Sequence, residues 1–136
     1  MKLVIDVNCI ISALIRDSIS REIIVRSSHR FYTPDHTYGK LQKYRELICE
    51  KSGLNNEDYD IMLTQIMRIV ETIPKSYYEK ELPHAKGLMG SVDIEDVPFI
   101  ALALKMDVPI WSDDKHFEEQ NKVKILKTRD IIELSE

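Results

Sequence analysis

Residues 108–117, VPIWSDDKHF, are the stretch that decides the fold and the chemistry expected of this sequence. Four residues suited to a buried strand, VPIW, run directly into two adjacent aspartates, Asp113 and Asp114. Neighbouring carboxylates repel each other, and crowding them costs free energy unless a cation or solvent compensates. The stretch is therefore either an ordinary acidic turn or part of a metal site, and the rest of the chain has to distinguish these two interpretations.

Other aspartates stand at comparable places along the chain. Asp6 ends a short hydrophobic strand predicted over residues 2–6, KLVID. Asp93 and Asp96 begin a helix whose apolar positions recur at helical spacing up to residue 104. Because Asp93 and Asp96 are three residues apart, they share one face of that helix. Pro98 fits such a helix if it begins near residue 95 or 96, since proline is tolerated in a first turn.

The hydrophobic pattern predicts four strands and several helices between them. The strands are expected over residues 2–6, 30–33, 108–111 and 123–126. The helices are expected over residues 9–16, from a cap at Ser20, over 35–51 with Gly53 ending it, from 55 or 56 to 73, from Asp93, and after a cap at Thr128. Residues 75–92 are mixed, with a loop at 84–91, HAKGLMGS.

The alternation of strands and helices predicts an α/β sandwich with a largely parallel sheet. The length of 136 residues fits one domain, and 43% hydrophobic residues are enough for one core. In an open parallel sheet, ligands collect beyond the carboxyl ends of the strands. If the strands ending at Asp6 and before Asp114 are neighbours, those two carboxylates face one crevice.

Charge and residue types limit the function. The net charge of −4 makes the chain a poor non-specific binder of nucleic acid, so a polyanionic substrate would need local basic patches or bound metal. Clustered carboxylates suit Mg²⁺ or Mn²⁺ rather than Zn²⁺, and the four histidines have no ligand spacing. The sequence contains neither a long apolar run nor a signal peptide, which predicts a cytoplasmic protein without a membrane span.

Three blocks of the sequence together resemble the PIN-domain family, which includes VapC-type toxins and other endoribonucleases. They are VIDVNCIISALI at 4–15, DIEDVPFIALAL at 93–104 and IWSDDKHF at 110–117. The resemblance spans essentially the whole chain and is strongest for archaeal-type members. It implies a single PIN-like domain over residues 1–136, a three-layer α/β sandwich with a mostly parallel five-stranded sheet. It also implies hydrolysis of RNA phosphodiesters by a metal-activated water.

The resemblance also assigns roles to individual residues. Asp6, Asp96 and Asp114 match the family's metal-binding and catalytic aspartates, which hold Mg²⁺ or Mn²⁺. Asn8 and Ser112 match polar residues that orient carboxylates or waters. Asp93 and Asp113 are additional acids, expected as supporting groups or as ligands of a second metal, and the choice of Asp114 over Asp113 rests on the family match alone.

One departure from the family lies on the helix after the second strand. The family usually carries a glutamate there, whereas this chain has Lys40, a lysine that could take the cation's place as a charge substitute. Glu46, six residues farther along, is the nearest alternative acid. Lys40, Lys43 and Arg45 are candidates for contact with the RNA backbone, or else form a solvated helix face.

These observations leave several functions open. The first is a Mg²⁺- or Mn²⁺-dependent endoribonuclease, the toxin of a toxin–antitoxin pair, whose partners are RNA, an antitoxin protein and a second copy in a homodimer. The alternative is a catalytically weakened protein of the same fold that acts by binding a partner protein or RNA. A haloacid-dehalogenase-type phosphatase is disfavoured because Asp6-Val7-Asn8 lacks the D-x-D pattern of that class.

Overall fold

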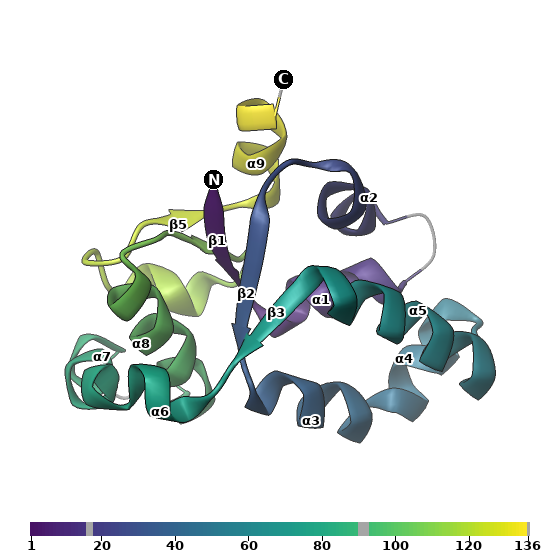
Figure 1. The fold of residues 1–136 in the computed structure, drawn as a ribbon, viewed down its shortest axis with the longest axis horizontal. Coiled ribbons are helices and arrows are strands. Elements are labelled where there is room, and N and C mark those ends of the chain that lie inside the picture. The colour runs from purple at the N-terminus through teal and green to yellow at the C-terminus, as the bar shows by residue number, and fades with distance from the viewer. Residues whose placement is uncertain (16–17, 90–92, 136) are drawn as a thin grey trace.

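A computed structural model describes residues 1–15, 18–89 and 93–135, and within them five strands form one sheet (Figure 1). Every neighbouring pair of strands is parallel, and the order is β3-β2-β1-β4-β5. The strands are β1 (Lys2–Ile5), β2 (Arg30–Pro34), β3 (Val70–Ile73), β4 (Ile110–Trp111) and β5 (Ile125–Leu126). The predicted α/β fold with a five-stranded parallel sheet is therefore confirmed.

Strand β1 is the centre of the sheet and of the hydrophobic core. Leu3, Val4 and Ile5 are completely buried, since β1 pairs with β2 on one side and with β4 on the other. Strands β2 and β3 follow β1 on one side of it, and β4 and β5 lie on its other side. The strand order therefore reverses at β1. That reversal places the ends of β1 and β4 side by side, as the sequence requires if Asp6 and Asp114 are to face one crevice.

Helices cover both faces of the sheet. Figure 1 shows α6, α7 and α8 on one side, and α1 to α5 on the other. The helices are α1 (Val7–Leu14), α2 (Ile19–Arg26), α3 (His36–Lys43), α4 (Arg45–Ser52), α5 (Asn56–Ile69), α6 (Lys75–Tyr78), α7 (Leu82–Met89), α8 (Val97–Met106) and α9 (Thr128–Ser135), with short 3₁₀ turns η1 (Glu79–Glu81), η2 (Ile94–Asp96) and η3 (Lys115–Glu119). None of the helices in the described ranges is long and apolar enough to cross a membrane.

Two of the sequence-based boundaries are wrong because tertiary pairing overrides a local pattern. The helix predicted to continue to residue 73 ends at Ile69, and Val70–Ile73 instead forms β3, paired with β2. The four residues VETI contain three β-branched side chains, which suit a strand as well as the end of a helix. The helix predicted over residues 35–51 is two helices, α3 and α4, which meet at Tyr44.

Other local predictions are corrected or confirmed in detail. Ser18 rather than Ser20 caps α2, because its side chain accepts a hydrogen bond from the Arg21 backbone N–H at 3.3 Å. The loop predicted at 84–91 is helical up to Met89, and residues 90 and 91 lie outside the described ranges. Gly53 ends α4 in the left-handed conformation, as predicted. Helix α8 begins at Val97 with Pro98 in its first turn, also as predicted.

Candidate active site

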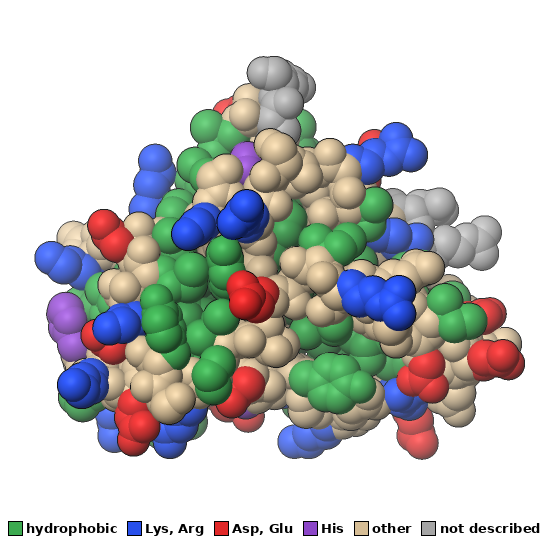
Figure 2. Space-filling view, in the orientation of Figure 1, with side chains coloured by type: hydrophobic (Ala, Val, Ile, Leu, Met, Phe, Trp, Pro, Cys, Tyr) green, Lys and Arg blue, Asp and Glu red, His purple; other side chains and the backbone are tan. Residues whose placement is uncertain are grey.

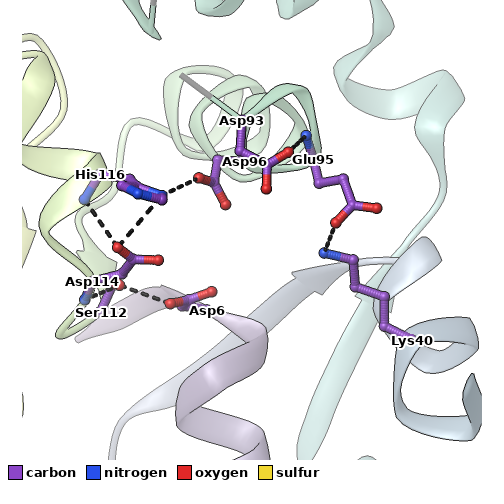
Figure 3. A network of polar contacts seen from close by, with 8 residues as sticks. All are labelled: Asp6, Lys40, Asp93, Glu95, Asp96, Ser112, Asp114 and His116. Carbon is purple, nitrogen blue, oxygen red and sulfur yellow. Dashed lines mark hydrogen bonds and ion pairs between the residues drawn. The ribbon is translucent and has the colours of Figure 1, made fainter. Parts of the chain in front are cut away.

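Three aspartates from distant parts of the chain converge on one cavity of about 370 Å³. Asp6 follows β1 and caps α1, Asp114 follows β4, and Asp96 lies where η2 meets α8. Asp93 and His116 line the same end of the cavity (Figure 3). The parallel neighbours β1 and β4 end at one edge of the sheet, and α8 packs across β1, so the fold itself brings these side chains together.

Asp6 is the most deeply buried of the acids, with 1% of its surface exposed. The Ser112 hydroxyl, itself fully buried, donates a hydrogen bond of 2.8 Å to Asp6 Oδ2. Burial raises the pKa of Asp6 to about 6, the bond from Ser112 and the backbone amide of Asn8 oppose that rise, and the charges of Asp96 and Asp114 add to it. The environment of Asp6 therefore disfavours the ionised carboxylate unless a cation binds nearby.

Ser112 also organises the loop that follows β4. Its Oγ accepts a hydrogen bond of 3.0 Å from the backbone N–H of Asp114. The Asp114 carboxylate in turn accepts a bond of 3.0 Å from the His116 backbone N–H. One hydroxyl thus hydrogen-bonds both to the Asp6 carboxylate and to the loop that carries Asp114.

Asp96 holds the clearest sign of a missing partner. Its Oδ2 atom is buried and has no hydrogen-bond partner, although the His116 Nδ1 atom lies 3.4 Å away at ion-pair distance. Burial is the largest cause of a raised Asp96 pKa, and the negative charges of Asp114 and Asp93 add to it. A buried carboxylate oxygen without a partner costs free energy, so it is the kind of atom that a cation would satisfy.

A divalent cation fits the residues at this end of the cavity. One ligand atom each from Asp96, Asp114 and His116 lie within 4.8 Å of one another. The buried Asp6 faces the same space and shares the electrostatic field of Asp96 and Asp114 (Figure 3). Carboxylate oxygens are the ligands preferred by Mg²⁺ and Mn²⁺.

The two supporting residues and the additional acid Asp93 also reach the site. Asn8 lines the cavity from the first turn of α1. Asp93 lines the cavity too, while its Oδ1 accepts a hydrogen bond of 3.0 Å from the Glu95 backbone N–H. Asp93 thus caps the η2 turn that presents Asp96, which is the ordinary structural role of an aspartate at a helix start.

Asp113 and Glu46 are not brought to the site. Asp113 turns away from the cavity, and its Oδ1 accepts a hydrogen bond of 2.9 Å from the backbone N–H of Thr128 while its Oδ2 accepts one from the Thr128 hydroxyl. It caps α9, so Thr128 is the first residue of that helix rather than its cap. Glu46 is exposed on α4 and is not among the residues that line the cavity.

The three basic candidates differ in position. Lys40 lines the cavity, and its Nζ atom lies 2.8 Å from Glu95 Oε2 (Figure 3). Lys43 lies over the ring of Tyr44, 5.6 Å from its centroid. Arg45 forms an ion pair with Asp60 at 2.6 Å, so its charge is engaged on α5 rather than in the cavity. Of the three, Lys40 alone lines the acidic cavity.

Sequence reasoning missed two residues of this site, His116 and Glu95. The histidines lack ligand spacing and so do not point to His116, yet it stands two residues after Asp114 in the same short loop. Glu95 adjoins Asp96, and its pairing with Lys40 depends on how α3 lies against η2. The sequence pattern D-x-H at residues 114–116 could have pointed to His116. The pairing of Glu95 with Lys40 could be seen only in the tertiary structure.

Charges of both signs are mixed on the face of the molecule that Figure 2 displays. Figure 2 shows lysine, arginine and acidic side chains interspersed on the face that it displays. This mixture agrees with the small net charge of −4. The electrostatics of the acidic cavity therefore depend on the charged groups close to it.

Comparisons with known proteins agree with the fold. A search of curated proteins finds no match. Among solved structures, a chain of the crystal structure of VapBC2 from Rickettsia felis, bound to a DNA fragment from their promoter, is similar with a TM-score of 0.67. The identity is 12%, and the match covers 93% of this chain and 98% of that chain. The family model of the PIN domain matches residues 4–134, and the chain therefore belongs to the PIN-domain family.

Proposed function

We propose that the protein is a metal-dependent endoribonuclease whose Mg²⁺ or Mn²⁺ is held by Asp6, Asp96 and Asp114. The observation that carries this proposal is the buried Oδ2 atom of Asp96, which accepts no hydrogen bond, has only the His116 imidazole at ion-pair distance and lies in one cavity with two further carboxylates. Membership of the PIN-domain family and the carboxylate-rich ligand set support it.

A divalent cation bound here would polarise a water molecule for attack on a phosphodiester and would offset charge on the phosphate. The residues of the chain have separate roles. Ser112 fixes the Asp6 carboxylate and the Asp114 loop by two hydrogen bonds. The Asn8 backbone amide favours the ionised form of Asp6. Asp93 caps the turn before Asp96, and His116 offers a nitrogen next to Asp96 and Asp114.

The second candidate, a weakened protein of the same fold, depends on Lys40 acting as a built-in substitute for the cation. The contact of Lys40 with Glu95 speaks against that substitution, because the lysine's charge is offset by Glu95 rather than by Asp6 or Asp114. An ammonium group already paired at 2.8 Å leaves the three aspartates in need of another positive charge. The nuclease is therefore the better supported of the two functions.

The partners of the protein follow from the same proposal. The substrate is RNA, and the likeness to VapBC2 supports an antitoxin-type protein as a partner. A homodimer is the assembly proposed from the family resemblance. The proposal places the protein in the cytoplasm and treats residues 1–136 as one functional domain. These assignments rest on the family rather than on a contact within this chain.

The test is cleavage of a mixed single-stranded RNA pool by the purified protein with Mn²⁺, with Mg²⁺ and with EDTA. We expect cleavage with either metal and none with EDTA. Asp6→Asn, which keeps the shape of the side chain but removes its charge, should abolish cleavage. Folded wild-type protein that cleaves nothing over a range of metal concentrations would contradict the proposal and favour a binding function.

A further inference from the structure

The cavity that contains the carboxylates has a second, apolar end. Ile11 from α1 and Tyr44, Leu47 and Ile48 from the α3–α4 elbow line it. Tyr44 and Leu47 remain 39% and 50% exposed, although both are large hydrophobic side chains. A metal and a phosphate group would need only the acidic end, so the apolar end calls for a separate explanation.

Two lysines also line this cavity. Lys40 on α3 and Lys51 on α4 line it on either side of Tyr44, the residue at which the two helices meet. The side chain of Lys40 is 17% exposed and makes its ion pair with Glu95 beside the acids. The cavity thus combines carboxylates, ammonium groups and an aromatic surface.

Contacts made by the residues on both sides of Tyr44 fix the elbow between α3 and α4. Lys43 Nζ lies 5.6 Å from the centroid of its ring, a cation–π contact. The next residue, Arg45, forms an ion pair with Asp60 at 2.6 Å and lies 4.8 Å from the centroid of the Tyr59 ring. These contacts anchor the elbow where α3 ends and α4 begins, and an anchored aromatic ring loses little further freedom when a ligand binds.

We propose that the apolar end of this cavity binds an unpaired nucleobase next to the phosphodiester held at the acidic end, with Tyr44 as the stacking surface. The proposal rests on the proposed nuclease function and deepens it, because it assigns Tyr44 to the base next to the scissile phosphodiester. Lys51 contacts a backbone phosphate of the bound strand, and Leu47 packs against the base.

The size and chemistry of the cavity favour a nucleotide over a protein segment. The cavity volume of about 370 Å³ lies at the lower end of the range of about 300–1,000 Å³ for small-molecule sites. A helix of a partner protein is about 10–12 Å wide with its side chains, so it would need a longer groove than this cavity provides. Aromatic side chains bind bases by stacking, and only an unpaired base can leave its own stack at little cost. Lysines near the ring supply the matching charge for phosphates.

The experiment measures binding separately from cleavage. In the Asp6→Asn background, a fluorescently labelled single-stranded RNA hexamer is titrated with protein, and the same strand annealed to its complement is titrated in parallel. We expect the single strand to bind at least about tenfold more tightly than the duplex. Tyr44→Ala should raise the Kd for the single strand about tenfold, and Tyr44→Phe should restore it.

Tyr77 provides a matched control elsewhere on the molecule. It is 47% exposed and has Lys105 Nζ 5.6 Å from its ring centroid, but it does not line the cavity. Tyr77→Ala should leave the Kd unchanged. Equal effects of Tyr44→Ala and Tyr77→Ala, equal binding of single strand and duplex, or no binding of either would overturn the proposal.

The binding result is independent of the cleavage result. Loss of affinity in Tyr44→Ala together with an inactive wild-type protein would support the base-binding site and contradict the nuclease. If the wild-type protein cleaves RNA but Tyr44→Ala has an unchanged Kd, the nuclease is supported and the base-binding site is overturned. The apolar end would then be a site for a protein partner.

Discussion

The hydroxyl group of Ser112, at the end of β4, donates a hydrogen bond of 2.8 Å to the Asp6 carboxylate at the end of β1. The two residues are 106 positions apart in the sequence, and both are buried. The same Ser112 oxygen accepts the backbone N–H of Asp114 at 3.0 Å. One side chain therefore links two neighbouring strand ends and two of the three candidate metal ligands.

Ser112→Ala should destabilise the protein by about 1–3 kcal/mol, because Asp6 Oδ2 and the Asp114 amide both lose their partner in a buried place. The measurement is urea unfolding in EDTA at neutral pH. In an Asp6→Asn background the loss should be smaller, since a hydrogen bond to a charged carboxylate is stronger than one to an amide. A loss that is the same in both backgrounds would show that Ser112 acts independently of the Asp6 charge.

Asp114→Asn should weaken Mn²⁺ binding strongly, whereas Asp113→Asn should leave it unchanged. Asp114 lines the cavity, but Asp113 bonds to Thr128 at the start of α9. Saturating Mn²⁺ at about 100 times its Kd should stabilise the wild type and Asp113→Asn by about 2.7 kcal/mol. Thermal unfolding with and without Mn²⁺ measures this effect.

The stability of the metal-free proteins supplies the control for this pair. Asp113→Ala should cost about 1 kcal/mol, typical of a lost helix cap. If Asp113→Asn instead abolished the stabilisation by Mn²⁺, the assignment of Asp113 to α9 alone would be wrong.

Lys40→Glu should tighten Mn²⁺ binding by about tenfold at low salt. The change replaces a positive charge that lines the cavity with a negative one and releases Glu95 from its ion pair. Isothermal titration with Mn²⁺ measures the affinity, and added salt should reduce the difference. Lys43→Glu is the matched control, because Lys43 lies on the same helix but outside the cavity lining. Equal effects of the two substitutions would mean that only net charge matters.

The metal-free protein should lose stability as pH rises from about 4 to above 6. The pKa of Asp6 is raised to about 6 in the folded state from an ordinary value of 3.8, so the folded state binds a proton more tightly than the unfolded state. The contribution is present at low pH and lost as pH passes the folded-state pKa, and it amounts to about 3 kcal/mol. Asp96, whose pKa is also raised, acts in the same direction.

Asp6→Asn tests this pH dependence directly. Urea unfolding in EDTA at pH 4.5 and at pH 7.5 should give a smaller decline for the variant than for the wild type, by about 2 kcal/mol, because part of the full effect lies below pH 4.5. Mn²⁺ should reduce the decline in the wild type, because a cation favours the ionised carboxylates. An unchanged decline in Asp6→Asn would place the titrating group elsewhere.

The sequence pattern was sufficient to predict the largely parallel sheet and acids at the ends of neighbouring strands, whereas the choice of Asp96 and of Asp114 over Asp113 came from the family resemblance. Hydrophobic strands that end in acids, separated by helices, require that arrangement once β1 and β4 are neighbours. The sequence was insufficient where two conformations were locally acceptable. Residues 70–73 suit either a helix end or a strand. They form a strand because they pair with β2.

Contacts made by side chains were the harder part of the site to predict. The elbow at Tyr44 depends on Arg45 meeting Asp60 and Tyr59 on another helix. The pairing of Lys40 with Glu95 likewise depends on tertiary placement, and Asp113 differs from Asp114 only in the direction of its side chain. Residue type alone cannot predict such directions.

The opposite directions of Asp113 and Asp114 also predict how the two positions tolerate substitution during evolution. The start of α9 needs only a hydrogen-bond acceptor at position 113, a requirement that Asn, Ser or Thr would also meet. The cavity needs a negative charge at position 114, which of the other side chains only Glu could supply, with a longer reach. Among descendants of this sequence that keep the metal chemistry, position 113 should therefore drift among small polar residues while position 114 stays acidic.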